Sequence, residues 1–424
     1  NKLKEYGYKI LGTSFDAIDI SEDRERFQKL IEKVGLKQPK SDISLGTKEL
    51  ISKSSKLNFP ILLRPSYVLG GRMMEKMNTL EDVQSYIDQN YWALENNVIL
   101  IDEFLKEAKE VDVDILRDKD GNTMIAGIME HIEEAGIHSG DSACCIPPFS
   151  LSEKVIESIK AFSINLSQEL NTIGLMNIQY AIKGEDIFIL EANPRASRTI
   201  PFLAKAIGIP FIKIAAELIT GETLTNEQIN FKPESLSYYA IKEAVFVFNK
   251  FPNTDVILGP EMKSTGEVMG IDNSFEIAYL KSQIAAGQKL DNIKNIFISI
   301  KDDDKEEISA YAQLLQENNF NLFTTRGTFN FLADKGIKSN LVNKVAEGRP
   351  HVVEYIKDNK IDLVINTTEN KQAIKDSVTI RRTAVELSIP YSTNLRSSKI
   401  LIKSIISLKK NEISVKAIQN HHKN

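Results

Sequence analysis

The chain has 424 residues, 42% of them hydrophobic, which is enough for two or three globular domains. Its 53 Lys and Arg residues against 58 Asp and Glu give a net charge of -5, and without a basic stripe this argues against a nucleic-acid partner. Two adjacent cysteines, Cys144 and Cys145, exclude a disulfide framework and favour a cytoplasmic location, and no apolar run reaches the roughly 18 residues of a membrane span.

The first 150 residues predict a mixed α+β arrangement with antiparallel strands. Residues 1–13, NKLKEYGYKILGT, look like the end of an αβ unit, so we expect the natural start to lie upstream. Residues 21–36 predict a helix that Ser21 caps and Gly35 stops, followed by a polar linker and a second helical stretch to about residue 56. Further predicted elements are strands at 59–68, 98–105, 109–118 and 123–132 and a helix at 79–90.

The segment 150–174 predicts a long amphipathic helix. It opens with a capping box formed by Ser150 and Glu153, keeps apolar residues at helical spacing and ends at Gly174.

From about residue 295 strands and helices alternate regularly, which predicts a separate parallel α/β domain. The expected strands are 296–300, 321–325 and 362–368, and the expected helices are 305–319, 329–336, 352–359, 372–387 and a last one after residue 397. The boundary with the preceding part is expected near residues 287–292.

Residues 176–195, MNIQYAIKGEDIFILEANPR, predict a hairpin with a patch of oxygen ligands. If residues 184–186 form its loop, the facing pairs are Lys183 with Ile187, Ala181 with Ile189, and Gln179 with Glu191. Because side chains alternate along a strand, Asn193 shares the face of Glu191. One carboxylate and two amides suit Mg²⁺ or Mn²⁺ that also contacts phosphate. The alternative is a solvated strand end.

Three other segments suggest a ligand. LLRPSYVLGGR, residues 62–72, has two glycines between Arg64 and Arg72, which favours a loop that approaches an anion closely. EEAGIHSGDSACC, residues 133–145, combines glycines with a histidine and small polar residues, and the alternative there is an ordinary surface loop. Glu103 and Glu110 lie at strand ends, where a carboxylate can hold ribose hydroxyls or be merely solvated. The sequence contains no GxxxxGK[ST] loop and no GxGxxG after a strand.

Several motifs together resemble the large chain of carbamoyl-phosphate synthase in order and spacing, over essentially all 424 residues. They are EDRERF, RPSYVLGGR, EVDVD, GIMEHIEEAGIHSGDSAC, GLMNIQYAIK, EANPRASRT, FNKFP and LGPEMKSTGEVMG. The resemblance is to the second of the family's two ATP-grasp halves, which carries a methylglyoxal-synthase-like regulatory domain. It implies phosphorylation of carbamate by ATP to carbamoyl phosphate, for pyrimidine and arginine biosynthesis.

The resemblance also implies a division of the chain and its partners. Residues 1–20 are expected to be the remnant of a pre-ATP-grasp domain, 21–225 an ATP-grasp domain, 226–290 the rest of the synthetase unit with a linker, and 291–424 the regulatory domain. Expected partners are the missing N-terminal part of the large chain and a glutaminase small subunit. The alternatives are a non-catalytic nucleotide-sensing fragment and another ATP-grasp ligase.

The resemblance assigns roles residue by residue. Residues expected at ATP are Arg24, Arg64, Gly70, Gly71, Glu103, Leu105, Glu110, Gly136, Ile137, His138, Ser139, Gln179 and Glu191. Metal ligands for Mg²⁺ or Mn²⁺, expected as two ions, are Gln179, Glu191 and Asn193, and K⁺ is a further expected cofactor. Arg64, Arg195 and Arg198 are expected to act on the reacting anions. Since phosphoryl transfer needs no protein nucleophile, Cys144 and Cys145, which have no obvious base, are interpreted as small buried residues.

Two effector sites are implied in the same way. Residues expected at a nucleotide monophosphate are Lys305, Thr325, Thr328, Lys344, Asn366 and Thr368. Residues expected at ornithine are Glu133, Asp141, Glu243 and Thr393. The sequence leaves open whether the effector is UMP, IMP, ornithine or none of these. The alternative for the C-terminal domain is that it is an inert packing domain.

Overall fold

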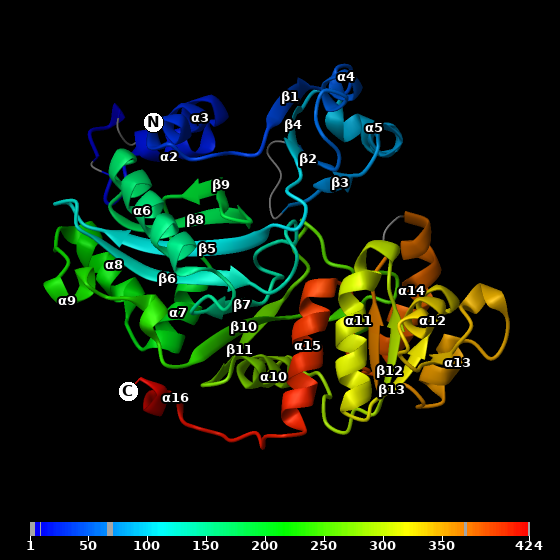
Figure 1. Cartoon of the computed structure of the whole chain (residues 1–424). Helices are drawn as coiled ribbons and strands as arrows, with labels where there is room; N and C mark the ends of the chain where they lie inside the picture. The colour runs from blue at the N-terminus through cyan, green and yellow to red at the C-terminus, as the bar shows by residue number, and fades with distance from the viewer. Residues whose placement is uncertain (1–4, 9, 66–70, 369–370, 423–424) are drawn as a thin grey trace.

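Three sheets organise the chain in the computed structural model, which describes residues 5–8, 10–65, 71–368 and 371–422 (Figure 1). They contain four, seven and five strands. Among the described residues, no helix combines the length and the apolar character needed to cross a membrane.

The four-stranded sheet forms a small lobe near the N-terminus. Its order is β1 (Ser41–Leu45), β4 (Val98–Glu103), β2 (Ile61–Pro65), β3 (Glu75–Met77), and every pair is antiparallel. The helices α4 (Leu50–Ser54) and α5 (Leu80–Leu94) pack on it through Leu50, Tyr86 and Leu63. The sequence predicted only a polar linker where β1 lies. Ser44 is the single buried residue of this strand, so β1 lacks the buried apolar side chains by which a strand is recognised in a sequence.

The seven-stranded sheet is antiparallel and carries helices on both faces. Its order is β11 (Gly266–Asp272), β10 (Tyr239–Val245), β7 (Cys144–Ile146), β6 (Thr123–His131), β5 (Lys109–Arg117), β8 (Gly174–Lys183), β9 (Asp186–Asn193). One face packs against α3 (Arg24–Val34) and α6 (Glu153–Glu169), with α2 (Phe15–Glu22) beside α3. The other face packs against α7 (Thr199–Ile207) and α8 (Phe211–Thr220), with α9 (Asn226–Ile229) and the turn η1 (Pro233–Ser235) next to them.

Two predicted helix starts are wrong by two residues each. Helix α3 begins after Asp23, whose carboxylate accepts the N–H of Arg26 at 2.9 Å, whereas Ser21 lies inside α2. The predicted stop is confirmed, because Gly35 ends α3 with φ of 76°, which favours glycine.

The second wrong start is that of α6. Its N-cap is Ser152, while the N–H of Ser150 donates to the buried carboxylate of Glu130 at 2.8 Å. The helix ends at Glu169, and Gly174 instead begins β8. Ser150 therefore binds Glu130 instead of capping the helix, and Ser152 is the N-cap.

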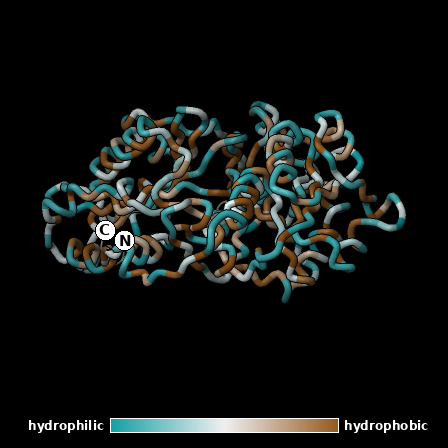
Figure 2. Tube along the Cα trace, turned by 60° about the horizontal axis from the view of Figure 1, so that its bottom comes forward, coloured by the Kyte–Doolittle hydropathy of each residue, from teal (hydrophilic) through white to brown (hydrophobic). Residues whose placement is uncertain are grey.

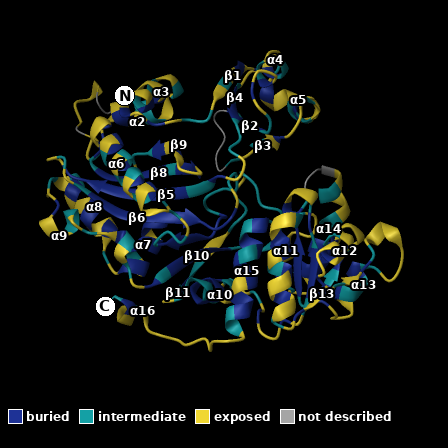
Figure 3. Ribbon diagram, viewed as in Figure 1, coloured by how far each residue is buried: buried dark blue, intermediate teal, exposed yellow. Residues whose placement is uncertain are grey.

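The five-stranded sheet is parallel throughout, as the sequence predicted. Its order is β14 (Asn340–Leu341), β13 (Asn321–Thr324), β12 (Asn295–Ser299), β15 (Leu363–Asn366), β16 (Tyr391–Ser392). The covering helices are α11 (Asp302–Glu317), α12 (Arg326–Asp334), α13 (Val352–Lys357), α14 (Lys371–Glu386) and α15 (Leu395–Leu408). The central strands β12 and β15 are largely buried, and Figure 3 shows the outer faces of the helices exposed. The two edge strands, of two residues each, were not predicted.

One hydrophobic core runs across the boundary predicted at 287–292. It joins Ile132 and Ala143 near the seven-stranded sheet, the helix α10 (Phe275–Ala285), Ile296 in β12 and Leu401 in α15, and Figure 2 shows hydrophobic segments on both sides. Short elements complete the chain: η2 (Phe248–Lys250), η3 (Val345–Glu347) and α16 (Ile418–His421).

Buried ion pairs also cross this junction. Arg381 in α14 is 0% exposed and donates from Nε to Asp255 at 2.8 Å, and Arg396 in α15 donates to Glu130 in β6 at 2.6 Å. The two parts of the chain are therefore packed as one body, since charges buried in this way need their partners.

We expect Gly270→Ala to destabilise the packing of β11 on α10. A Cβ atom at Gly270 would overlap the carbonyl oxygen of Ala278 and lie 2.5 Å from the backbone nitrogen of Ser282. Overpacking of this kind costs about 1–3 kcal/mol, measurable as a lower urea midpoint. Gly266→Ala in the same strand is the control, because nothing lies within 4 Å of its Cβ. Equal midpoints for the two variants would contradict this packing.

Candidate active site

The pairing of β8 with β9 contains a β-bulge that sets the site. The turn has two residues, Gly184 and Glu185, so that Lys183 faces Asp186 and Ala181 faces Phe188. The predicted facing pairs nearest the turn are therefore wrong by one residue. The register shifts between Gln179 and Tyr180, which leaves one residue of β9 unpaired, and beyond it Gln179 faces Glu191 as predicted.

Two rows of polar side chains cross three neighbouring strands at this place. Asp112 in β5 faces Gln179, which faces Glu191, and Asp114 in β5 faces Asn177, which faces Asn193. Facing residues share one side of a sheet, and so do residues two apart in a strand. The Nδ2 atom of Asn193 donates to Oε1 of Glu191 at 2.8 Å, so the three predicted metal ligands lie together.

The predicted phosphate arginines come together on a carboxylate that the sequence did not single out. Asp102 in β4 accepts a hydrogen bond from Arg24 at 3.0 Å and one from Arg64 at 2.6 Å. Asp102 is 9% exposed, and charge-assisted pairs in such surroundings are stronger than surface pairs. Asp102 thus fixes two guanidinium groups from α3 and β2; its only signal in sequence was its place before Glu103.

The loop 133–141 lies between the small lobe and the seven-stranded sheet. The N–H of Gly136 donates to Glu110 in β5 at 2.9 Å, and a Cβ at Gly136 would lie 2.5 Å from the ring of Phe104. The N–H of His138 donates to the carbonyl of Gly259 at 2.8 Å. Gly136, Ile137, His138 and Ser139 are all partly buried. The loop is therefore held from three sides.

Glu103 and Leu105 mark the other side of this region. Glu103 ends β4 and accepts both the backbone and the side-chain N–H of Asn58 at 2.9 Å. Leu105 is partly buried two residues later. The Oε1 atom of Glu103 therefore already accepts two hydrogen bonds from Asn58, a contact that the sequence did not indicate.

The electrostatics of Glu110 and His138 tie this loop to the metal-ligand face. Burial raises the pKa of Glu110, and the carboxylate of Glu191 is among the charges that raise it further. Burial lowers the pKa of His138, Arg198 also lowers it, and Glu191 raises it. His138 therefore lies within electrostatic range of both Glu191 and Arg198. Its lowered pKa favours the neutral ring, and because Nδ1 accepts the N–H of Gly140 at 3.0 Å, Nε2 is the nitrogen that can donate to a ligand.

The predicted glycine loop is described only at its end. Residues 66–70, including Gly70, lie outside the described residues. Gly71 has φ of 72°, and a Cβ there would overlap the carbonyl oxygen of Pro260. Gly71 therefore allows the loop to approach the same segment that binds the N–H of His138 through Gly259.

The predicted substrate arginines follow β9 directly. The Nη2 atom of Arg195 donates to Oδ1 of Asn193 at 3.2 Å. Arg198 precedes α7, and its guanidinium donates to the sulfur of Met262. Both side chains are exposed or partly exposed beside the metal ligands, which leaves guanidinium N–H groups free to contact an anion.

The prediction that neither cysteine has a neighbouring base is wrong for Cys144. His131 faces Cys144 in the pairing of β6 with β7, and ligand atoms of Asp112, His131 and Cys144 lie within 4.8 Å of one another. All three are buried, and the His131 ring bonds to the Asp112 carboxylate at 2.9 Å. We therefore interpret this cluster as structural. Cys145 is buried as predicted.

Comparisons with known proteins agree with this geometry. Residues 23–227 match the family described as "Carbamoyl-phosphate synthase L chain, ATP binding domain", and residues 307–393 match "MGS-like domain". The C-terminal section of the carbamoyl phosphate synthase large chain of Methanopyrus kandleri is 43% identical over 99% of this chain and 79% of that protein. This chain belongs to the carbamoyl-phosphate synthase large-chain family.

The chain spans less than half the length of several large chains that it resembles. The large chain of Myxococcus xanthus is 48% identical over 99% of this chain, which spans 39% of that protein. Among solved structures, N5-carboxyaminoimidazole ribonucleotide synthetase from Thermotoga maritima has a TM-score of 0.50 at 16% identity, over 68% of this chain and 76% of that one. That likeness supports the ATP-grasp fold alone.

The MGS-like domain gathers several predicted effector residues at the carboxyl ends of its strands. The hydroxyls of Thr325 and Ser299 lie 3.2 Å apart, Thr328 accepts the N–H of Ile300 at 3.3 Å, and Asn366 donates to the carbonyl of Ser299 at 3.3 Å. Ligands of parallel sheets bind at these ends.

The remaining predicted effector residues lie around this edge. Lys305 pairs with Asp302 at 2.5 Å and lies near Gly327, and Thr368 follows β15. Lys344 caps η3, and its N–H donates to Glu347 at 2.9 Å.

A cavity of about 220 Å³ lies between the MGS-like domain and the seven-stranded sheet. Glu133, Glu243 and Thr393 line it, with Tyr279. Burial raises the pKa of Glu133 to about 7, and burial with the charge of Glu133 raises the pKa of Glu243 well above its usual range. Asp141 is not among the lining residues, since its carboxylate accepts the N–H groups of Lys263 and Ser264.

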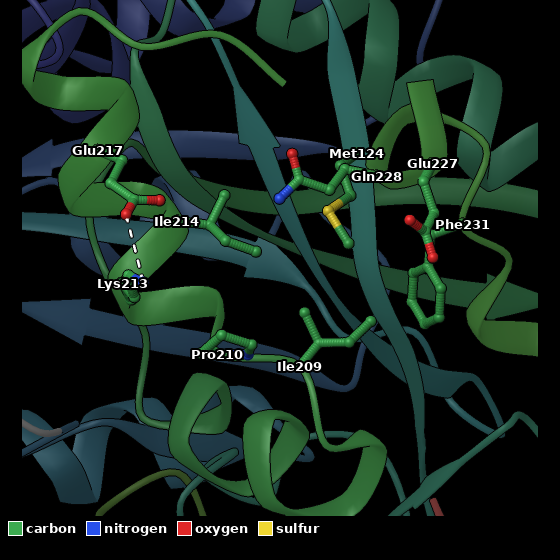
Figure 4. Close-up of a pocket in the computed structure, with 9 residues that line it drawn as sticks. All are labelled: Met124, Ile209, Pro210, Lys213, Ile214, Glu217, Glu227, Gln228 and Phe231. Carbon is green, nitrogen blue, oxygen red and sulfur yellow. Dashed lines mark ion pairs between the residues drawn. The ribbon is translucent and has the colours of Figure 1, made fainter. Parts of the chain in front are cut away.

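A larger cavity of about 310 Å³ lies between α8 and α9 (Figure 4). Its walls are mixed. Ile209, Pro210, Ile214 and Phe231 are apolar, whereas Glu227, Gln228 and the ion pair of Lys213 with Glu217 are polar. None of the predicted site residues is among those that line it.

We expect Gly71→Ala to weaken nucleotide binding. A residue with a side chain strains the backbone at φ of 72° and overlaps Pro260, which costs about 1–3 kcal/mol. The affinity for MgADP, measured by titration calorimetry, should fall about tenfold. Gly259→Ala is the control, because its Cβ meets nothing within 4 Å. Unchanged affinity in Gly71→Ala would show that this end of the loop does not close on the nucleotide.

Proposed function

We propose that this chain catalyses the ATP-dependent phosphorylation of carbamate to carbamoyl phosphate. The observation that carries the proposal is the pairing of Gln179 with Glu191, next to Asn193 and to Arg195. It joins oxygen ligands to arginines on the face of an ATP-grasp sheet in a chain of this family. Pyrimidine and arginine biosynthesis are the pathways that carbamoyl phosphate would supply.

The chain's residues supply positioning and charge in this reaction. The carbamate oxygen attacks the terminal phosphorus, so negative charge must be neutralised around it. Arg64, oriented by Asp102, would contact the phosphates, and Arg195 and Arg198 would hold the carbamate. Glu110, which accepts the N–H of Gly136, and His138 in the loop 133–141 would position the nucleotide.

The donor set fits ATP with Mg²⁺ or Mn²⁺. The side chains of Gln179, Glu191 and Asn193 offer only oxygen, the donor that these ions prefer, and the bound ions would neutralise the phosphate charge. For K⁺, the buried hydroxyl of Ser142 has no hydrogen-bond partner among the described residues, so its oxygen is available as a ligand for the cation.

We propose the division of the chain at residues 20, 225 and 290, which the family matches over 23–227 and 307–393 support. The chain spans 39% of the Myxococcus xanthus relative, so we propose an N-terminal part of the large chain and a glutaminase subunit as partners. Two buried free thiols support a cytoplasmic location.

We further propose that the MGS-like domain binds a regulatory nucleotide monophosphate such as UMP or IMP, and that the 220 Å³ cavity takes ornithine. The hydroxyls of Thr325 and Thr328 at the strand ends support the first, and the paired carboxylates of Glu133 and Glu243 support the second.

We expect Glu191→Ala to abolish ATP synthesis from MgADP and carbamoyl phosphate, with the proposed N-terminal part supplied. Loss of the only carboxylate among the metal ligands should lower kcat by at least about 1000-fold. Glu185→Ala is the control, because Glu185 lies in the turn of the same hairpin and, among the described residues, its carboxylate pairs with exposed Lys154. Activity retained in Glu191→Ala would contradict the metal assignment.

We expect ornithine to bind more tightly as pH rises. Burial raises the pKa of Glu133 to about 7, so the carboxylate gains its charge between pH 6 and 8, and affinity for the cation should increase about tenfold over that range. Calorimetry at several pH values measures it. In Glu133→Gln the dependence should flatten, and an affinity that falls with pH would contradict the site.

A further inference from the structure

Asp114 lies beneath the turn that carries both predicted substrate arginines. It is 0% exposed in β5, and it faces Asn177 in β8, which in turn faces Asn193 in β9. The turn after β9 runs from Asn193 to Thr199, where α7 begins. Asp114 is therefore placed where the end of β9 and the start of α7 meet.

Three side chains converge on this carboxylate. Its Oδ1 accepts the hydroxyl of Ser197 at 2.7 Å and the amide of Asn177 at 3.1 Å, and its Oδ2 accepts the hydroxyl of Thr199. Ser197 and Thr199 also lie 2.7 Å apart, oxygen to oxygen. Burial raises the pKa of Asp114 to about 6, and the hydrogen bonds from Thr199 and Ser197 act to lower it. The carboxylate that forms above this pH accepts stronger hydrogen bonds than a neutral group does.

Two of the three donors to Asp114 are the sequence neighbours of Arg198. Ser197 and Thr199 stand on either side of Arg198, and Arg195 is tied to Asn193 at the other end of the turn. The proposed mechanism does not use Asp114, yet burying a carboxylate is energetically costly. A buried carboxylate that holds one turn by two hydrogen bonds, from Ser197 and Thr199, is better explained by the precision that the turn needs than by stability.

We propose that Asp114 is a positioning residue that fixes the turn 193–199, so that Arg195 and Arg198 meet the carbamate or carbamoyl phosphate at a set distance from the metal ligands. This inference rests on the proposed function for the identity of the substrate. The geometric part, which is the fixing of the turn by Asp114, stands on the hydrogen bonds alone.

The first test compares Asp114→Asn with Asp118→Asn in the reverse reaction, with the proposed N-terminal part supplied. Asp118 is a matched control, because it is also 0% exposed and accepts the N–H groups of Asp120, Asn122 and Leu224, but it lies beyond the end of β5 and its partners are outside the turn 193–199. In Asp114→Asn the KM for carbamoyl phosphate should rise about tenfold and kcat should fall on the order of 100-fold, while the KM for MgADP stays within about twofold. Asp118→Asn should leave both KM values unchanged.

A second measurement separates this inference from the proposed function. Hydrogen exchange of the backbone amides 193–199, in the chain as it is, should be about tenfold faster in Asp114→Asn and Ser197→Ala and unchanged in Asp118→Asn. If the wild type binds MgADP but makes no ATP, the proposed function is overturned and the exchange result alone decides the role of Asp114.

The results that overturn the inference are equally defined. Equal KM values for carbamoyl phosphate in wild type and Asp114→Asn would do so, as would unchanged exchange at 193–199. Should Asp114→Asn fail to fold, Ser197→Ala removes one donor without touching the sheet. Its KM for carbamoyl phosphate should still rise about threefold, and no change would refute the proposal.

Discussion

The candidate site depends on one unpaired residue in β9. After the two-residue turn, regular pairing would place Leu190 opposite Gln179 and send Glu191 to the face that packs under α3 and α6. A shift of one residue turns every following side chain to the other side of a sheet. The bulge at Leu190 reverses that, so that Glu191 and Asn193 join Gln179 on the polar face. A carboxylate in the hydrophobic core would otherwise be the result.

The same face concentrates charges that the fold must compensate. Alternation in β5 sends Val111 and Val113 into the core beneath α6, and Asp112 and Asp114 to the opposite side. Each acidic group has a partner there: His131 for Asp112 at 2.9 Å, and the hydroxyls of the turn before α7 for Asp114. Buried carboxylates persist because they are bonded in this way. On this face Asn193 is hydrogen-bonded to Glu191, another predicted metal ligand, and to Arg195, a predicted substrate residue.

A series of contacts crosses the junction between the MGS-like domain and the rest of the chain. Arg381 donates to Asn366, a predicted effector residue, and to Asp255 in the segment that leads to Gly259 and Pro260. That segment contacts His138 and Gly71 of the predicted nucleotide site. Hydrogen bonds and packing contacts therefore connect the strand ends of the MGS-like domain to the predicted nucleotide loop. Coupling of two sites requires contacts that differ between two states.

Local patterns in the sequence were enough to predict the C-terminal domain, one helix end and the shared face of three site residues. Alternation of strands and helices predicted the parallel C-terminal sheet, Gly35 predicted the end of α3, and the spacing of Gln179, Glu191 and Asn193 predicted one shared face. The predicted pairing of Gln179 with Glu191 is right although its assumed turn is wrong, because the shorter turn and the bulge compensate each other. Only the tertiary structure decided the use of Ser150 by Glu130, the joining of Arg24 and Arg64 by Asp102, and the place of Asp114 under the turn. Such contacts join segments far apart in the chain, and no local period or propensity encodes them.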